Sequence, residues 1–106
     1  MIKIYGSEMC PDCLECKANF DDYNIEYEFI DINESLSNLS AFLKLRDTYP
    51  RFDHCKEIGD IGLPTLIFED GTLDLDWEGY LKKLGKEVTT HYEEGHACNL
   101  SDRKGC

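Results

Sequence analysis

The tetrapeptide Cys10-Pro11-Asp12-Cys13 constrains this chain more than any other stretch, because it falls where a short strand gives way to a helix. The β-prone run Ile2–Tyr5 precedes it, and two small residues interrupt that run. Pro11 suits the first turn of a helix, where its missing N–H has no intrahelical partner. We therefore expect Cys10 at a helix start, where unpaired N–H groups and the helix dipole favour a thiolate and lower the pKa of a cysteine.

The second cysteine of the motif makes a redox pair. Cys13 follows Cys10 by one helical turn on the same face, close enough for a disulfide, so the pair can exchange two electrons with a partner. A zinc site is the competing interpretation of C-x-x-C, and it needs two more ligands at a matching spacing. The later cysteines and histidines form no second tight pair; they are Cys55, Cys98, Cys106, His54, His91 and His96. The motif near a βαβ pattern favours redox chemistry.

Cys16 extends the spacing to C-x-x-C-x-x-C and raises a second alternative. A metal or iron–sulfur binding module would use Cys10, Cys13 and Cys16 as ligands. All three would lie on one regular helix, and the sequence shows no fourth ligand. We expect Cys16 to be a small buried residue of that helix, and we expect no metal.

Length and charge restrict the class of protein further. A chain of 106 residues builds one small domain, and a formal net charge of −11 argues against nucleic acid or an anionic membrane as partner. No apolar run is long enough for a membrane span, and the N-terminus carries no secretory signal pattern. These features predict a cytoplasmic protein, and we expect a monomer.

The remaining patterns predict the order β-α-β-α-β-β-α. The first three elements form a βαβ unit, so its strands should be parallel with a right-handed crossover. Residues 51–62 are polar and punctuated by glycine, and they predict a loop with exposed His54 and Cys55. Residues 86–106 lack periodicity and are expected to form an irregular or loosely packed tail behind a domain of residues 1–85. The expected elements after the first strand are Pro11–Tyr23, Glu26–Ile32, Ser35–Tyr49, Leu63–Phe68, Thr72–Leu75 and Trp77–Leu84.

Together, the first strand, the C-P-x-C motif, the proline before the third strand, the hairpin and the capped last helix resemble glutaredoxin, of the thioredoxin superfamily. The likeness covers residues 1–85 and is greatest to small glutaredoxin-related proteins of anaerobic bacteria with C-P-D-C-like sites. It implies a thioredoxin-like α/β fold. In that fold a four-stranded mixed sheet of order 2-1-3-4 is flanked by three helices, here followed by the C-terminal tail.

The resemblance also implies an activity. Cys10 would attack disulfides, Cys13 would resolve the mixed disulfide, and Pro64 would take the cis form, which places the Leu63 backbone beside the sulfurs. The implied protein is a dithiol oxidoreductase that reduces protein or glutathione mixed disulfides. Either glutathione or a thioredoxin-reductase-like protein would recycle it.

A glutathione co-substrate would use further positions. The resemblance places its γ-glutamyl carboxylate at the backbone N–H groups of Asp76 and Trp77, and its glycine carboxylate near Arg51, with Leu63 and Pro64 along its backbone. The chain departs from glutaredoxins in having Ser7-Glu8 where a lysine is usual, Asp12 between the cysteines, and Asp74-Leu75 in place of two glycines. We expect the carboxylates of Glu8, Asp12 and Glu15 to raise the pKa of Cys10 and to oppose an anionic tripeptide.

Overall fold

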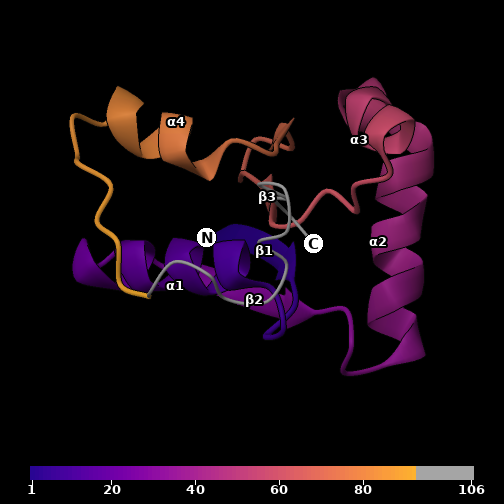
Figure 1. Cartoon of the computed structure of the whole chain (residues 1–106), viewed down its shortest axis with the longest axis horizontal. Coiled ribbons are helices and arrows are strands. Elements are labelled where there is room, and N and C mark those ends of the chain that lie inside the picture. The colour runs from indigo at the N-terminus through magenta and orange to yellow at the C-terminus, as the bar shows by residue number, and fades with distance from the viewer. Residues whose placement is uncertain (93–106) are drawn as a thin grey trace.

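A four-stranded sheet with helices on both faces forms the molecule in a computed structural model, which describes residues 1–92 (Figure 1). The strand order is β2-β1-β3-β4; β1 pairs with β2 in parallel, while β3 is antiparallel to both β1 and β4. This confirms the predicted mixed sheet of order 2-1-3-4. The elements are β1 (Ile2–Gly6), α1 (Pro11–Asp22), β2 (Tyr27–Asp31), α2 (Leu36–Thr48), the 3-10 helix η1 (Pro50–Phe52), α3 (Asp53–Ile58), β3 (Thr65–Ile67), β4 (Leu73–Asp74) and α4 (Trp77–Lys83).

Two apolar clusters lie on opposite sides of the sheet. On one side Phe20 of α1 and Leu81 of α4 pack against Ile4 of β1. On the other side Phe42 of α2 and Phe52 of η1 pack together, with their ring centroids 5.9 Å apart. Figure 1 shows α1 and α4 on one side of the strands and α2 with α3 on the other. The first helix spans both clusters, since its first residues reach the second one.

The segment predicted as a loop, residues 51–62, is partly helical, and that prediction was wrong. Pro50 ends α2, as expected, and then opens η1, which α3 follows directly. Phe52 is fully buried and Cys55 is 8% exposed, and this spacing of three places both on the inward face of a short helical stretch. Gly59, with φ of 77°, ends α3 in the left-handed conformation. Residues 1–92 therefore contain α3 in addition to the three α-helices expected.

The other predicted boundaries hold to within one or two residues, and side chains at the helix starts explain why. The hydroxyl of Ser35 accepts a hydrogen bond from the Asn38 N–H at 3.0 Å, and the carboxylate of Asp76 accepts one from the Gly79 N–H at 3.0 Å. These caps fix the starts of α2 and α4. The position of α4 matters for the site below, because its first residues face the start of α1.

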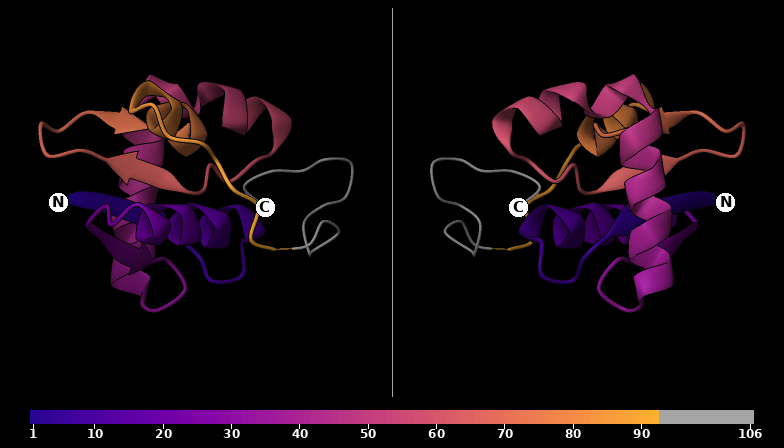
Figure 2. Two further views of the ribbon diagram at one scale, coloured as in Figure 1. Left: turned by 90° about the vertical axis from the view of Figure 1, so that its left-hand side faces the viewer. Right: turned by 90° about the vertical axis from the view of Figure 1, so that its right-hand side faces the viewer.

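Beyond α4, residues 86–92 run back along α1 without forming a helix or strand (Figure 2). The buried Asn19 side chain pairs with the backbone of Thr89, donating to its carbonyl at 2.9 Å and accepting from its N–H at 2.8 Å. The Tyr23 hydroxyl donates to the Glu87 carbonyl at 2.6 Å. His96, Cys98 and Cys106, which were predicted to lie in the tail, fall outside the described residues. Within residues 1–92 no helix has the length and apolar character that a membrane span requires.

Candidate active site

Cys10 occupies the N-cap position of α1, in an extended conformation with φ of −102° and ψ of 115°. Its N–H donates to the Ser7 carbonyl at 3.1 Å, and its carbonyl accepts from the Leu14 N–H at 3.1 Å. Ser7 is buried; its hydroxyl accepts from the Met9 N–H at 3.1 Å and donates to the side chain of Asn33. From the sequence, Ser7 was interpreted as a break after the first strand and as a departure from the lysine usual in glutaredoxins. The structure shows that it holds the turn that presents Cys10.

The two cysteines of the motif have opposite acid–base character. The pKa of Cys10 is lowered because the Cys13 thiol donates a hydrogen bond to its sulfur, and backbone N–H groups of Cys13 and Asp12 add to this against the effect of burial. The pKa of Cys13 is raised by that same hydrogen bond and by burial. Of the two thiols, Cys10 therefore loses its proton first, and Cys13 retains its proton. Both are free thiols in this structure.

The pKa of Cys10 is lowered overall, as its place at a helix start predicts, although three neighbouring carboxylates were expected to raise it. Glu8 is engaged by the Lys17 ammonium at 2.6 Å, and Glu15 accepts hydrogen bonds from the N–H groups of His91 and Tyr92. Asp12 does raise the pKa of Cys10 through its charge, as expected, but the hydrogen bonds to the sulfur outweigh it. Local donors thus decide the acidity of Cys10.

The second cysteine of the motif is enclosed. Cys13 is fully buried, and its sulfur fills the space above Gly6, where an added Cβ would lie 2.8 Å from Sγ. Cys16 is also fully buried, in the cluster between the sheet, α1 and α4, and burial raises the pKa of its thiol. Its surroundings match the expected role as a small core residue. In residues 1–92 no three His, Cys, Asp or Glu side chains are arranged to hold a metal ion.

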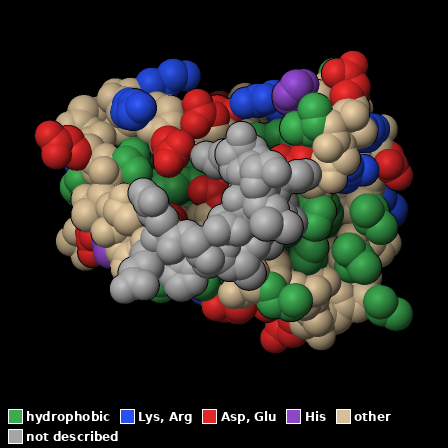
Figure 3. All heavy atoms as spheres, viewed as in Figure 1, with side chains coloured by type: hydrophobic (Ala, Val, Ile, Leu, Met, Phe, Trp, Pro, Cys, Tyr) green, Lys and Arg blue, Asp and Glu red, His purple; other side chains and the backbone are tan. Residues whose placement is uncertain are grey.

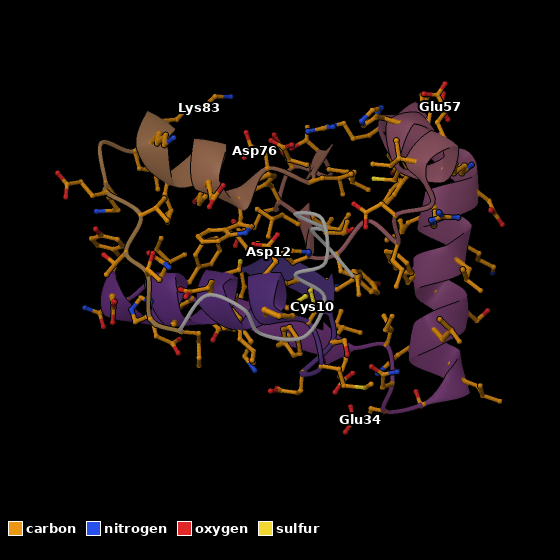
Figure 4. All side chains as sticks on the ribbon, viewed as in Figure 1. Cys10, Asp12, Glu34, Glu57, Asp76 and Lys83 are labelled. Carbon is orange, nitrogen blue, oxygen red and sulfur yellow. The ribbon has the colours of Figure 1, made fainter. Side chains whose placement is uncertain are left out.

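A groove of about 180 Å³ lies beside the dithiol, and we call it the acidic groove. Its apolar wall includes Leu63 and Leu75, which belong to the same cluster as Cys10 and Cys13. The Leu63–Pro64 peptide bond is cis. Trp77 completes that wall. Four carboxylates also line the groove: Asp12, Asp60, Asp76 and Glu78. Figure 4 shows Cys10 and Asp12 at the start of α1, facing Asp76 at the start of α4.

The structure brings together most of the residues that sequence reasoning proposed for a glutathione site. Leu63, Asp76 and Trp77 all line the acidic groove, and the buried Pro64 adjoins them. Arg51 is not among the lining residues. Its guanidinium instead contacts the Asp74 carboxylate at 2.9 Å, beside the hairpin.

Sequence reasoning missed other groups that line the acidic groove. Cys55 was predicted to be an exposed loop residue, but it is buried and lines the groove, and burial together with the charge of Asp60 raises its pKa. The spacing from Phe52 to Cys55 was the available signal, and the polar residues around them obscured it. Glu78 was not noticed at all. His54 is exposed, as expected, with its ring 3.8 Å from Glu57.

The fold, with two adjacent thiols at the start of α1, defines a thioredoxin-like protein. A family model described as Glutaredoxin matches residues 2–56, which is more than half of the chain. The chain is 36% identical over 73 residues to an uncharacterized protein of Haemophilus influenzae, a match covering 69% of this chain and 85% of that protein. No solved structure matches. The chain belongs to the glutaredoxin family.

Proposed function

We propose that this protein is a thiol–disulfide oxidoreductase that reduces disulfides with the Cys10/Cys13 pair. The Cys10 thiolate attacks one sulfur of the substrate disulfide, forms a mixed disulfide and releases the other sulfur as a thiolate, which takes up a proton. Cys13 then loses its proton and attacks Cys10 Sγ. The second substrate thiolate leaves, and the enzyme retains a Cys10–Cys13 disulfide, so two electrons have passed to the substrate.

The observation that carries this proposal is the asymmetry of the pair. Hydrogen bonds from Cys13 and from two backbone N–H groups stabilise negative charge on Cys10, while Cys13 stays protonated and buried. A nucleophile needs the first condition, and a resolving thiol that acts only after the mixed disulfide forms fits the second. We assign Leu63 and Pro64 to the backbone of the bound substrate, because Leu63 borders the groove beside Asp12.

Glutaredoxins typically use glutathione, and the acidic groove fits this tripeptide poorly. Glutathione carries two carboxylates and one ammonium group, whereas the described residues that line the groove include four carboxylates and no lysine or arginine. Arg51, proposed from the sequence as a carboxylate partner, is engaged by Asp74. We therefore propose protein disulfides as substrates, and a thioredoxin-reductase-like protein rather than glutathione as the reductant that restores the dithiol.

The remaining assignments are also proposals. Within the family, the motif Cys10-Pro11-Asp12-Cys13 supports a place among the small C-P-D-C proteins of anaerobic bacteria. We propose that the protein acts in the cytoplasm as a monomer, with residues 1–85 as its redox domain. The net charge of −11 supports the absence of nucleic acid and anionic membranes from its partners.

The assignment of roles is tested by substituting each cysteine. Cys13→Ser should accumulate a mixed disulfide on Cys10, visible by mass spectrometry of the unreduced protein, because the resolving thiol is missing. Cys10→Ser should lower disulfide reduction by at least about a hundredfold. Cys55→Ala is the matched control, since it removes another buried thiol bordering the groove. Because Cys13 is still present in this variant, the mixed disulfide should not accumulate. Full activity of Cys10→Ser would refute the assignment.

A metal or iron–sulfur module built from Cys10, Cys13 and Cys16 is the alternative from another class. Protein purified without oxygen distinguishes the two. A dithiol enzyme should contain no stoichiometric metal and should lack a visible absorption band. In a redox titration it should exchange two electrons per chain rapidly. A stoichiometric metal lost on alkylation of these cysteines would favour the alternative instead.

A further inference from the structure

Ser7 contacts both cysteines of the motif through its backbone. Its carbonyl accepts a hydrogen bond from the Cys10 N–H at 3.1 Å, and its own N–H donates to the Cys13 sulfur. The same sulfur packs against the preceding residue, since a Cβ added to Gly6 would lie 2.8 Å from it. Both contacts place the peptide unit between Gly6 and Ser7 against the sulfur that attacks second in the proposed reaction.

The Ser7 side chain fixes the turn that carries this peptide unit. Ser7 is 5% exposed, and its hydroxyl accepts from the Met9 N–H at 3.1 Å while it donates to the side-chain oxygen of Asn33. Asn33 follows β2, where its N–H donates to the Asp31 carboxylate at 2.8 Å. The loop after β2 thus holds the loop before α1, through a contact between residues 26 apart in the sequence.

The second step of the proposed reaction requires Cys13 to become ionised. In the reduced protein, the hydrogen bond to Cys10 and burial raise the pKa of Cys13. Once Cys10 is bonded to a substrate, it carries no negative charge that would oppose a thiolate on Cys13, but burial and the charge of Asp12 still act on it. The Ser7 N–H has the opposite effect on that pKa, and it does so without any contribution from Cys10.

The two thiols differ in the groups that stabilise their charge. Figure 3 shows acidic side chains spread over the face on which Figure 4 labels Cys10 and Asp12, and negative charge on this face opposes a thiolate. The backbone N–H groups that stabilise Cys10 are those of Asp12 and Cys13, which belong to α1 itself. The donor to Cys13 comes instead from the turn at Ser7, so only Cys13 depends on how that turn is held.

We propose that Ser7 is a positioning residue of the resolving step: its side chain, held by Asn33, keeps the Ser7 N–H on the Cys13 sulfur as that thiol ionises. This rests on the dithiol function proposed above. In the resolving step the Cys13 thiol gives its proton to water, and the thiolate attacks Cys10 Sγ. The Cys10–Cys13 bond forms and the bond between Cys10 and the substrate breaks. The substrate sulfur leaves with the electron pair and takes up a proton.

The test separates the two steps in time. The reduced full chain is mixed with the symmetric disulfide of a short peptide in which serine flanks the cysteine on both sides, and the reaction is quenched with acid. Mass spectrometry of the intact chain and of its proteolytic peptides gives the amounts of the mixed disulfide on Cys10 and of the Cys10–Cys13 disulfide. Ser7→Ala should slow conversion of the first into the second by at least about threefold at neutral pH, because less Cys13 is ionised. It should change the rate of mixed-disulfide formation less.

Two further variants separate positioning from folding. Asn33→Ala removes the acceptor of the Ser7 hydroxyl at an exposed position and should slow the same conversion. The double variant should be no slower than Ser7→Ala alone, because the hydrogen bond between the two side chains is already lost. Ser35→Ala is the matched control: it also removes a serine hydroxyl that accepts a backbone N–H, that of Asn38 at 3.0 Å, and should leave both rates unchanged.

The pH dependence of the conversion is a readout that a purely structural role would not move. Removing a donor raises the pKa of a thiol, so the pH at which conversion reaches half of its maximal rate should move upward in Ser7→Ala, with the maximal rate little changed. The charges of Cys10 and Asp12, which also act on Cys13, are the same in every variant.

The outcomes separate this inference from the function on which it rests. Equal slowing of both steps, or a lower maximal rate of conversion with an unchanged half-maximal pH, would overturn the role of Ser7 and leave the dithiol function standing. Unchanged conversion in both Ser7→Ala and Asn33→Ala would overturn it as well. If the unsubstituted chain formed neither disulfide at Cys10, the proposed function itself would be removed.

Discussion

Acidic side chains along α1 differ in the groups that surround them. From its second turn to its C-terminal end, Glu15 and Asp22 are engaged by residues that follow α4: Glu15 accepts the His91 and Tyr92 N–H groups, and Asp22 lies 2.6 Å from the His91 ring nitrogen Nε2. At its N-terminal end Asp12 borders a groove shared with three more carboxylates. Acidic groups of the first kind hold the chain to itself, whereas those of the second kind gather where segments distant in sequence meet.

One face of α1 forms a clamp, which we define as the side chains of Glu15, Asn19 and Asp22 holding residues 87–92. Asn19 mimics a peptide group, pairing with both backbone groups of Thr89, and its amide also donates to the Glu15 carbonyl at 2.8 Å. Cys10 caps the N-terminus of the same helix. The clamp therefore restrains that helix without contacting the thiols.

The largest expected effect is the loss of Asn19 from the clamp. Asn19→Ala should lower the free energy of unfolding by about 2–4 kcal/mol, because it removes three partly buried hydrogen bonds, two of them to the backbone of Thr89. Urea unfolding of the full chain measures it. Asn38→Ala is the control: it removes one side-chain bond to Asp31, at 3.0 Å in a partly exposed place, and should cost about 1 kcal/mol or less. Equal costs for the two variants would show that the clamp is no more than a surface contact.

A smaller effect, dependent on pH, is expected from His91. Asp22 first and Glu15 second raise its pKa above the ordinary 6.5. A raised folded-state pKa means that the stabilising contribution is complete below about pH 6.5 and is lost as pH rises through the folded-state pKa. The melting temperature of the His91→Gln variant should therefore fall below that of the unsubstituted protein at mildly acidic pH and approach it at alkaline pH.

The His91 prediction can be checked against the carboxylate that contributes most. In an Asp22→Asn background, the change in melting temperature caused by His91→Gln should depend less on pH, since the amide introduced beside the ring carries no charge and only Glu15 still raises the pKa of His91. NMR titration of the His91 ring provides a direct measurement of the same change. If His91→Gln shifted the melting temperature of the otherwise unsubstituted protein equally at every pH, hydrogen bonding alone, and not protonation, would join His91 to the clamp.

The smallest expected effect lies at the other end of the helix. Asp12→Asn removes the charge that raises the pKa of Cys10 but keeps an oxygen for the Trp77 indole, so the pKa of Cys10 should fall further. At a pH below the pKa of Cys10, the alkylation rate of the Asp12→Asn variant should exceed that of the unsubstituted protein. The increase should be less than about fivefold, because a single partly exposed charge is removed. Glu8→Gln is the matched control, because Glu8 is engaged by Lys17. Equal acceleration in both variants would mean that overall charge, rather than Asp12, acts on the thiol.

Much of the fold could be predicted because its signals are local. The Cys10-Pro11 junction, the Ser35 and Asp76 caps and the break at Pro50 each depend on neighbours a few residues away, and the structure bears each of them out. α3 was missed because its inward face consists of only two residues within a polar stretch. Short helices are stabilised by tertiary contacts, which a local pattern does not reveal.

The site was less predictable because its character depends on contacts distant in sequence. The net acidity of Cys10 could not be derived by counting nearby carboxylates, since Glu8 and Glu15 are engaged by Lys17 and by the His91 region. The partnership of Asn19 with Thr89 spans 70 residues and leaves no sequence pattern. Asp60 likewise lines the groove only because the segment after α3 lies near the start of α4.

The hydrogen bond from Trp77 to Asp12 has an optical consequence. Trp77 is the chain's single tryptophan, it is 2% exposed, and its indole N–H contacts Asp12, one of the two residues between Cys10 and Cys13. Its fluorescence is therefore an intrinsic reporter of these two thiols, needing no label, and its intensity should change when the Cys10–Cys13 disulfide forms. The same ring borders the acidic groove, so iodide, an anion, should quench its fluorescence less than neutral acrylamide does.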